Sequence, residues 1–186
     1  MSHLFIKKTA LTDLYLIERN TYSDNRGYFD RLFCCDELQN ILGSRKIVQI
    51  NHTKTTKAGI IRGMHYQSPP HAEMKFVTCL RGSIFDVAVD IRSNSPTFLQ
   101  WHSEVLTQDN QATFVIPEGF AHGFQALTDD VELLYFHSST YCLEAEAGLD
   151  AFDKILSIKW PVEVVERSIR DQSHPAIEVN FTGLIL

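Results

Sequence analysis

Two stretches of the sequence carry the residue types that proton-transfer chemistry requires. The stretch 59–81 holds His65 in a polar context and Lys75 within an apolar run, and the stretch 115–124 holds His122 after a turn. A histidine titrates near neutral pH and can act as a general base. A fixed lysine can stabilise an oxyanion. Both stretches have the pattern of strand, turn and strand, which predicts the inside of a small β-barrel with a polar pocket at its mouth.

The general-base hypothesis requires three further features in the folded protein. The base needs a carboxylate or carbonyl to fix its tautomer, and a tyrosine, Tyr135 or Tyr141, would serve as a neutral acid. Lys75 lies between Met74 and Phe76 and would need a partner if it points inward. Alternation along the strand fits an outward lysine equally well, and lone histidines and tyrosines in sheets are commonly core residues. Spacing alone leaves both interpretations open.

A metal site is the competing interpretation of the same histidines. Metal-binding barrels of the cupin kind offer two closely spaced histidines, a carboxylate and a distant histidine. The matching positions here are His65, Gln67, His71 or Glu73, and His122. Gln67 interrupts the histidine pair, and an amide is a weak ligand for transition metals. We therefore expect no metal at this site.

Composition limits the functional classes. The chain has 186 residues, which favours a single domain over 1–186. Its net charge of −6, without a basic block, argues against a nucleic-acid or anionic-membrane binder. No apolar run approaches the roughly 20 residues that cross a bilayer, and the N-terminus does not read as a secretory signal. The four cysteines form no C-x-x-C pair, so we expect reduced thiols and a cytoplasmic location.

The order of elements predicts an all-β protein. Short period-two segments separated by turn residues are typical of an antiparallel jelly-roll, cupin-like barrel with a few short helices. The expected strands cover 14–17, 28–33, 47–51, 84–91, 98–107, 112–116, 123–126 and 131–136. One short helix is expected from Asp36, as its capping residue, to a stop at Gly43. In 84–91 the alternation predicts one buried face, with Asp86 and Asp90 on the other.

Across nearly its whole length the chain resembles the dTDP-4-dehydrorhamnose 3,5-epimerase family. The matching segments are DNRGYF from Asp24, QINH from Gln49, RGMHYQSPP from Arg62, Lys75, RGSIFDVAVDIR from Arg81, SPT from Ser95, IPEGFAHGF from Ile116, LY from Leu134, YCLEAE from Tyr141, IKWP from Ile158 and SIRD from Ser168. The resemblance implies a jelly-roll homodimer that uses neither a metal nor an organic cofactor.

The resemblance also implies roles for individual residues. His65 would be the base, Asp171 its partner, Tyr135 the proton donor and Lys75 the charge beside the ketone oxygen. Substrate-contacting positions would be Arg26, Gln49, Asn51, Arg62, His122, Tyr141, Glu146 and Arg170, together with Arg31 at a position where relatives often carry glutamate. The substrate would be a nucleotide-linked 4-keto-6-deoxyhexose, whose C3 and C5 protons are both acidified by the C4 ketone.

Two departures from the family pattern bear on specificity. Arg31 reverses the charge usual at its position, and Phe136 and His137 follow Tyr135 where relatives often have lysine. The main expectation is conversion of dTDP-4-dehydro-6-deoxyglucose to dTDP-4-dehydrorhamnose. The alternatives are a single-centre epimerase acting on a CDP- or GDP-linked sugar, or a non-catalytic sugar-nucleotide-binding barrel. The sequence leaves open the nucleotide base, the number of centres inverted and the pathway.

Overall fold

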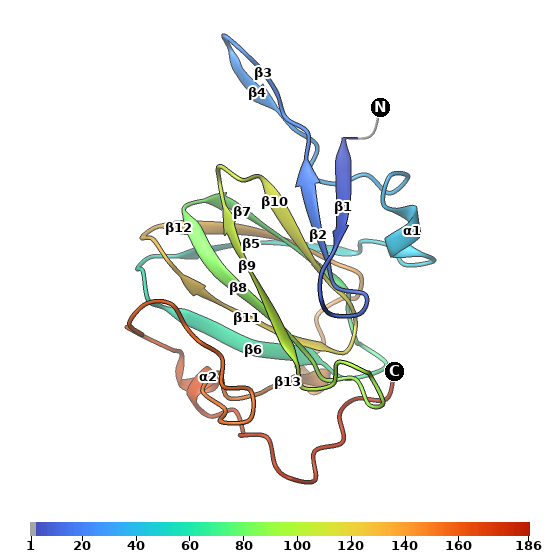
Figure 1. The fold of residues 1–186 in the computed structure, drawn as a ribbon, viewed down its shortest axis with the longest axis vertical. Coiled ribbons are helices and arrows are strands. Elements are labelled where there is room, and N and C mark those ends of the chain that lie inside the picture. Colours follow the sequence, from blue (N-terminus) through green and yellow to red (C-terminus); the bar gives the residue numbers. More distant parts are fainter. Residues whose placement is uncertain (1–2) are drawn as a thin grey trace.

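Two antiparallel sheets face each other in the computed structural model, which describes residues 3–186 (Figure 1). The larger has the order β1-β2-β10-β7-β12-β5, formed by Leu4–Lys8, Tyr15–Arg19, Ala112–Ile116, Lys75–Arg81, Val131–His137 and Gln49–Thr55. The smaller has the order β13-β6-β11-β8-β9, formed by Glu146–Gly148, Ile61–Gln67, Phe120–Ala126, Ser83–Asp90 and Trp101–Thr107. The helical elements are short: α1 (Gln39–Leu42), the 3₁₀ turn η1 (Leu143–Ala145) and α2 (Ile169–Gln172). This arrangement confirms the predicted all-β barrel fold with a few short helices.

Apolar side chains from both sheets fill one end of the space between them. Val77, Phe114 and Leu133 from the larger sheet meet Ile84 and Phe124 from the smaller one, and all are nearly inaccessible to solvent. Burial of such side chains stabilises the sandwich by roughly 1.5–3 kcal/mol each. The other end is left to polar residues, so the core fixes the two walls of a pocket.

Each sheet is also covered on its outer face. The segment that contains α1 packs on the larger sheet, where Leu38 and Leu42 meet Phe76 and Phe136. The long C-terminal segment covers the smaller sheet, where residues such as Leu156 contact the outer side chains of β8. Strands such as β10 and β11 are therefore buried at every position, on both faces of their sheets.

The prediction that β8 has one buried face is wrong. Asp86, Ala88 and Asp90 are as fully buried as Val87 and Val89 on the opposite face. The C-terminal segment covers one face and the larger sheet covers the other. The carboxylates that alternation assigned to solvent therefore lie inside the protein, where they need partners.

Two N-terminal predictions also need correction. The expected strand over 28–33 is only a short hairpin arm, because β3 (Tyr22–Asp24) pairs with β4 (Gly27–Phe29) and the chain then leaves the hairpin to cross the larger sheet. The helix begins at Gln39 rather than at Asp36; Leu38 precedes it and no side chain caps it. Its expected end is confirmed, since Gly43 adopts a positive φ and its N–H binds the carbonyl of Gln39.

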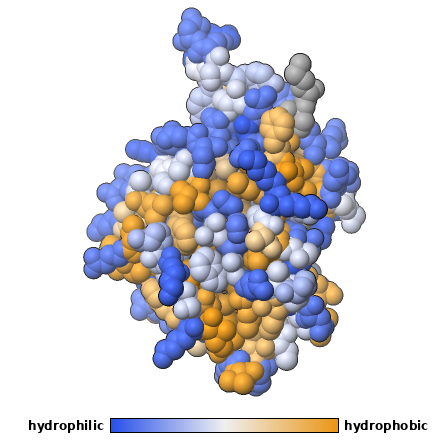
Figure 2. Space-filling model, viewed as in Figure 1, coloured by the Kyte–Doolittle hydropathy of each residue, from blue (hydrophilic) through white to orange (hydrophobic). Residues whose placement is uncertain are grey.

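The β3–β4 hairpin projects from the body of the protein, and its tip is hydrophilic (Figures 1 and 2). The aromatic side chains of Tyr28 and Phe29 are largely exposed on it, and that of Tyr22 is about half exposed. A two-stranded hairpin has little stability without packing partners.

Among residues 3–186, no helix has the length and apolar character needed to span a membrane.

Candidate active site

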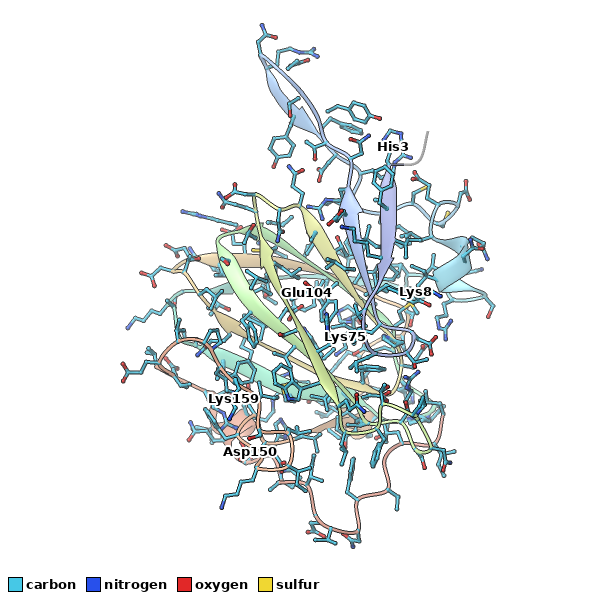
Figure 3. All side chains as sticks on the ribbon, viewed as in Figure 1. His3, Lys8, Lys75, Glu104, Asp150 and Lys159 are labelled. Atoms are coloured by element: carbon cyan, nitrogen blue, oxygen red, sulfur yellow. The ribbon has the colours of Figure 1, made fainter. Side chains whose placement is uncertain are left out.

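A polar cavity of about 280 Å³ opens between the two sheets. The smaller sheet contributes His65 from β6 and His122 from β11, and the larger sheet contributes Lys75 from β7 and Tyr135 from β12. Lys75 lies near the middle of the molecule (Figure 3). The remaining lining residues are Asn51, Thr53, Arg62, Tyr66, Gln67, Glu73, Phe124, His137, Tyr141, Glu146 and Arg170. The cavity therefore collects residues from distant parts of the sequence onto two opposing walls.

His65 forms a dyad with Asp171. Its Nε2 lies 2.9 Å from Oδ1 of Asp171, and the other carboxylate oxygen accepts the N–H of Gly63 at 3.0 Å. Burial alone would raise the pKa of Asp171, but the hydrogen bonds from His65 and Gly63 hold that pKa well below its usual range. An ionised carboxylate accepts only, so Nε2 of His65 carries the proton and its Nδ1 keeps a free lone pair. This is the tautomer that a general base requires.

The short helix α2 places this carboxylate behind the histidine. Ser168 caps the helix, with its hydroxyl accepting the N–H of Asp171 at 3.0 Å. Arg170 is also close, with Nη2 3.3 Å from Nε2 of His65 and Nη1 2.8 Å from Glu146. The same Nε2 cannot donate to Asp171 and accept from Arg170. The shorter, charge-assisted bond to Asp171 decides the tautomer.

Tyr135 stands on the opposite wall from His65. Burial raises the pKa of its hydroxyl well above the usual range, and the carboxylate of Asp86 raises it further. The phenol is therefore neutral at physiological pH and can donate a proton. Tyr141, the other tyrosine considered from the sequence, is 53% exposed, and its hydroxyl donates to Glu146 at 2.9 Å. The geometry favours Tyr135 as the acid.

Lys75 points into the cavity and is buried, which resolves the question that alternation left open. Its Nζ lies 3.1 Å from Oε1 of Glu73, whose other oxygen is 2.7 Å from Nδ1 of His137. Burial would raise the pKa of Glu73, but His137 and Lys75 outweigh it and lower that pKa. The lysine charge is thus held in place by an ionised carboxylate.

A second histidine–carboxylate pair lies deeper in the cavity wall. Nε2 of His122 is 2.6 Å from Oδ1 of Asp86, and the rings of His122 and Tyr135 are 6.2 Å apart. Complete burial raises the pKa of Asp86, and the nearby His122 opposes that rise. Asp86 fixes the orientation of His122 in the same way as Asp171 fixes His65.

The predicted substrate-contacting residues fall into two groups. Asn51, Arg62, His122, Tyr141, Glu146 and Arg170 all line the cavity. Gln49 lies at its rim, where its side chain accepts the N–H of Tyr141 at 3.0 Å. A neighbouring hollow of about 450 Å³ shares Arg62, His65 and Arg170 and adds Lys54.

Arg26 and Arg31 are not among the residues that line the cavity of their own chain. Arg26 lies at the tip of the projecting hairpin, 85% exposed at its side chain, and pairs with Asp24 at 2.5 Å. Arg31 pairs with Glu37 on the segment that covers the larger sheet. Within one chain, neither guanidinium meets the other predicted site residues.

His65, Asp171 and His174 form a group whose ligand atoms lie within 4.8 Å of one another. Both oxygens of Asp171 already accept hydrogen bonds, from His65 and from Gly63. Arg170 adds a positive charge 3.7 Å from the same carboxylate. These contacts oppose the binding of a cation, so the cluster fits an oriented base better than a metal centre.

Four residues of the site lay outside the roles assigned from the sequence. Alternation was misleading for Asp86, because it assigned to solvent the face of β8 that in fact turns toward the larger sheet and is buried. His137 lies two residues after Tyr135 and so shares its face of β12. Glu73 was considered only as a metal ligand. The ring of His174 lies 5.5 Å from that of His65, but no sequence pattern in the irregular C-terminal segment marks this residue.

Comparison with known proteins gives the same family over most of the chain. The sequence profile of the family described as dTDP-4-dehydrorhamnose 3,5-epimerase matches residues 8–178. The Shigella flexneri enzyme of that name is 42% identical over 157 residues, 84% of this chain and 86% of the relative. The Salmonella typhimurium enzyme of that name is 37% identical over 178 residues, 94% of this chain and 96% of the relative.

A solved structure extends the comparison to three dimensions. The dTDP-6-deoxy-D-glucose-3,5-epimerase of Legionella pneumophila, in complex with dTDP-4-keto-L-rhamnose, superposes with a TM-score of 0.91. It is 36% identical, and the match covers 99% of this chain and 100% of the other. The match extends over both sheets and over the C-terminal segment that carries the partner of His65. The chain therefore belongs to the dTDP-4-dehydrorhamnose 3,5-epimerase family.

Proposed function

We propose that this protein, as a single domain over 1–186, epimerises C3 and C5 of dTDP-4-dehydro-6-deoxyglucose to give dTDP-4-dehydrorhamnose. The observation that carries the proposal is the placement of an oriented base and a neutral acid on opposite walls of one cavity. Inversion of a carbon centre needs a proton to leave one face and another to arrive at the other face. His65 with Asp171 and, across the cavity, Tyr135 supply these two functions.

The C4 ketone makes both steps accessible. His65 takes the proton from the carbon next to the ketone through Nδ1, and the bonding pair moves into the ring to give an enolate with charge on O4. The ammonium of Lys75 stabilises that charge, and the interaction is strongest when the bound substrate excludes water from the cavity. The enolate then takes a proton from Tyr135 on the opposite face, which re-forms the ketone and inverts the centre. The cationic His65 is stabilised by Asp171.

The basic rim suits the nucleotide diphosphate. Arg62, Arg170 and Lys54 line the hollow beside the cavity. A guanidinium group can bind two phosphate oxygens at once through two parallel hydrogen bonds. We propose that the diphosphate lies there, with Gln49, Asn51, Tyr141 and Glu146 contacting the sugar and base. His122, held by Asp86, would contact the sugar. No metal and no organic cofactor enters this chemistry.

A homodimer would bring the remaining arginines into use. We propose that the β3–β4 hairpin packs on a second copy and presents Arg26 at the cavity of that copy, with Arg31 near the same contact. The exposed aromatic residues Tyr28 and Phe29 support this, since they are 65% and 63% exposed on an otherwise unsupported hairpin. We also propose a cytoplasmic location, which the free thiols of all four cysteines support.

Incubation in deuterated water tests the function directly. dTDP-, CDP- and GDP-linked 4-keto-6-deoxyhexoses are each supplied, and the label is located at C3 and C5 by NMR. We expect label and inversion at both carbons of the dTDP sugar and loss of both in His65→Asn. His102→Asn is the matched control, because His102 pairs with Glu104 at 2.7 Å but does not line the cavity.

The same experiment separates the alternatives. If only one carbon is labelled, the protein is a single-centre epimerase. If a CDP- or GDP-linked sugar is preferred, the natural substrate carries that nucleotide instead of dTDP. Binding without exchange on any of the sugars indicates a non-catalytic barrel and refutes the proposal. Exchange at the wild-type rate in His65→Asn places the base elsewhere.

A further inference from the structure

Glu73 and His137 have no part in the proposed proton transfers, yet both are buried in the cavity wall. Glu73 lies between two donors: Nζ of Lys75 at 3.1 Å from one oxygen and Nδ1 of His137 at 2.7 Å from the other. Lys75 and His137 are direct neighbours in the pairing of β7 with β12. The three side chains are each about 10% exposed or less, so water does not replace these contacts.

The hydrogen bonds continue from His137 to the mouth of the cavity. Nε2 of His137 lies 3.3 Å from Nδ2 of Asn51, and Oδ1 of Asn51 accepts from Nε2 of Gln49 at 3.3 Å. Oε1 of Gln49 in turn accepts the backbone N–H of Tyr141 at 3.0 Å. We call this series of five hydrogen bonds, from the N–H of Tyr141 to the ammonium of Lys75, the Lys75 relay.

The relay has donors at both ends. A backbone N–H and an ammonium can only donate, whereas the amides of Gln49 and Asn51 and a neutral imidazole each donate once and accept once along the series. Such a series closes without a donor–donor contact only if one member accepts twice. The carboxylate of Glu73 is that member. Because Glu73 accepts from both sides, neutral His137 must carry its proton on Nδ1. The side-chain amides of Asn51 and Gln49 then have only one orientation that avoids a donor–donor contact.

We propose that Glu73 and His137 are positioning residues that orient Asn51 and Gln49 for the nucleotide sugar and at the same time hold the ammonium of Lys75. Glu73 sets the direction of every hydrogen bond in the relay, and His137 transmits that direction from the oxyanion end of the cavity to its mouth. The role assigned to Asn51 and Gln49 rests on the proposed function. The direction of the relay does not.

Substitution of Glu73 by glutamine reverses the relay. Because Lys75 only donates, the new amide oxygen must face Lys75, and the new NH₂ group faces His137. Without a member that accepts twice, the series must contain one donor–donor contact. We expect this contact at the exposed rim, where water can relieve it, because a buried unpaired donor costs about 1–3 kcal/mol. His137 shifts its proton to Nε2, and the amides of Asn51 and Gln49 turn over. Substitution of Asn51 by aspartate has another outcome: two carboxylates flank His137, which becomes doubly protonated.

The ring nitrogens of His137 report the direction without any turnover. ¹⁵N NMR separates protonated from unprotonated imidazole nitrogens, and His137→Phe assigns the signal. At neutral pH we expect the neutral Nδ1–H form in the wild type, the neutral Nε2–H form in Glu73→Gln and the imidazolium in Asn51→Asp. The Nε2–H form in the wild type, or an unchanged tautomer in Glu73→Gln, overturns the proposal. Asn51→Asp, at an exposed position, still decides the direction if Glu73→Gln does not fold.

A double-mutant cycle on dTDP affinity tests the transmission to the mouth. Glu73→Gln should weaken dTDP binding about 5-fold, the equivalent of one neutral hydrogen bond of about 1 kcal/mol. His137→Phe cuts the relay and leaves Asn51 and Gln49 in their original orientation. In that background Glu73→Gln should therefore change dTDP binding by less than about 2-fold. Equal effects in both backgrounds refute transmission through His137.

The two measurements separate failure of this inference from failure of the proposed function. A wild-type protein that does not bind dTDP contradicts the proposed ligand, while the NMR pattern continues to test the relay. The expected NMR pattern together with additive binding effects confirms the direction of the hydrogen bonds and refutes their role in recognition.

Discussion

Replacement of Asp171 by asparagine tests how the base is oriented. The two side chains have nearly the same shape, so packing against Gly63 and His65 is retained. The N–H of Gly63 can only donate and lies 3.0 Å from the carboxylate, so it fixes the amide oxygen on its own side. The NH₂ group must then face Nε2 of His65, 2.9 Å from the carboxylate in the wild type. His65 is forced to accept there and to carry its proton on Nδ1, where the base needs a lone pair.

The loss of turnover caused by a wrong histidine tautomer has a known order of magnitude. In a serine protease the corresponding change of aspartate to asparagine lowers turnover by roughly 10⁴-fold, or about 5.5 kcal/mol of transition-state stabilisation. We expect a similar loss of deuterium incorporation at C3 and C5, measured by NMR in deuterated water. Asp171→Ala should lose less, because without either group both tautomers of His65 are accessible.

Two controls make this prediction refutable. Thermal unfolding should show that Asp171→Asn remains folded, and dTDP affinity should stay near that of the wild type. Exchange within about ten-fold of the wild-type rate would show that Asp171 does not control the tautomer. An alanine variant as slow as the asparagine variant would show that the carboxylate acts through its charge alone.

Four further predictions follow from the site. Tyr135→Phe should keep some deuterium exchange at C5 while inverted product falls roughly 10²–10⁴-fold, the range of general acid catalysis; equal loss of both would place Tyr135 in enolate stabilisation. Activity should survive exhaustive chelation, and loss of activity on removal of a stoichiometric metal would contradict the metal-free mechanism. The pKa values of Asp171 and Glu73 are lowered in the folded protein, so both carboxylates stabilise the fold above the ordinary carboxyl pKa of about 4, and this contribution is lost as pH falls. Urea unfolding should show the free energy of unfolding falling with pH in this range, and the pH dependence should be weaker in Asp171→Asn. Light scattering should give a dimer at micromolar concentration, and Arg26→Ala should keep the dimer but weaken substrate binding; an active wild-type monomer would refute the shared site.

The sequence predicted the strands better than it predicted their surroundings. Period-two patterns located β8, β10 and β12 to within a few residues because side chains in a strand alternate regardless of what covers them. They could not tell that both faces of β8 are buried, since the covering layers come from the opposite sheet and from the C-terminal segment. At the N-terminus, aromatic residues of high strand propensity gave a short hairpin, because the chain crosses the larger sheet instead of extending within it.

Recognisable side chains marked part of the site, and the fold supplied their relations. His65, Lys75 and His122 could be identified as candidates from residue type and from the strands that carry them. The sequence alone left Lys75 free to face either way, and the pairing of β7 between β10 and β12 turns it inward toward Glu73.

The contacts that convert these residues into a chemical site join positions far apart in the chain. Asp171 reaches His65 across 106 residues, and His137 reaches Glu73 across 64. Which nitrogen of each histidine carries the proton depends on these partners, and the partners depend on strand register and on the C-terminal segment returning across the smaller sheet. Local patterns determined the strands and the reactive side chains, whereas the tautomers, the charges and the two opposed walls were decided only by tertiary structure, because long-range packing sets them.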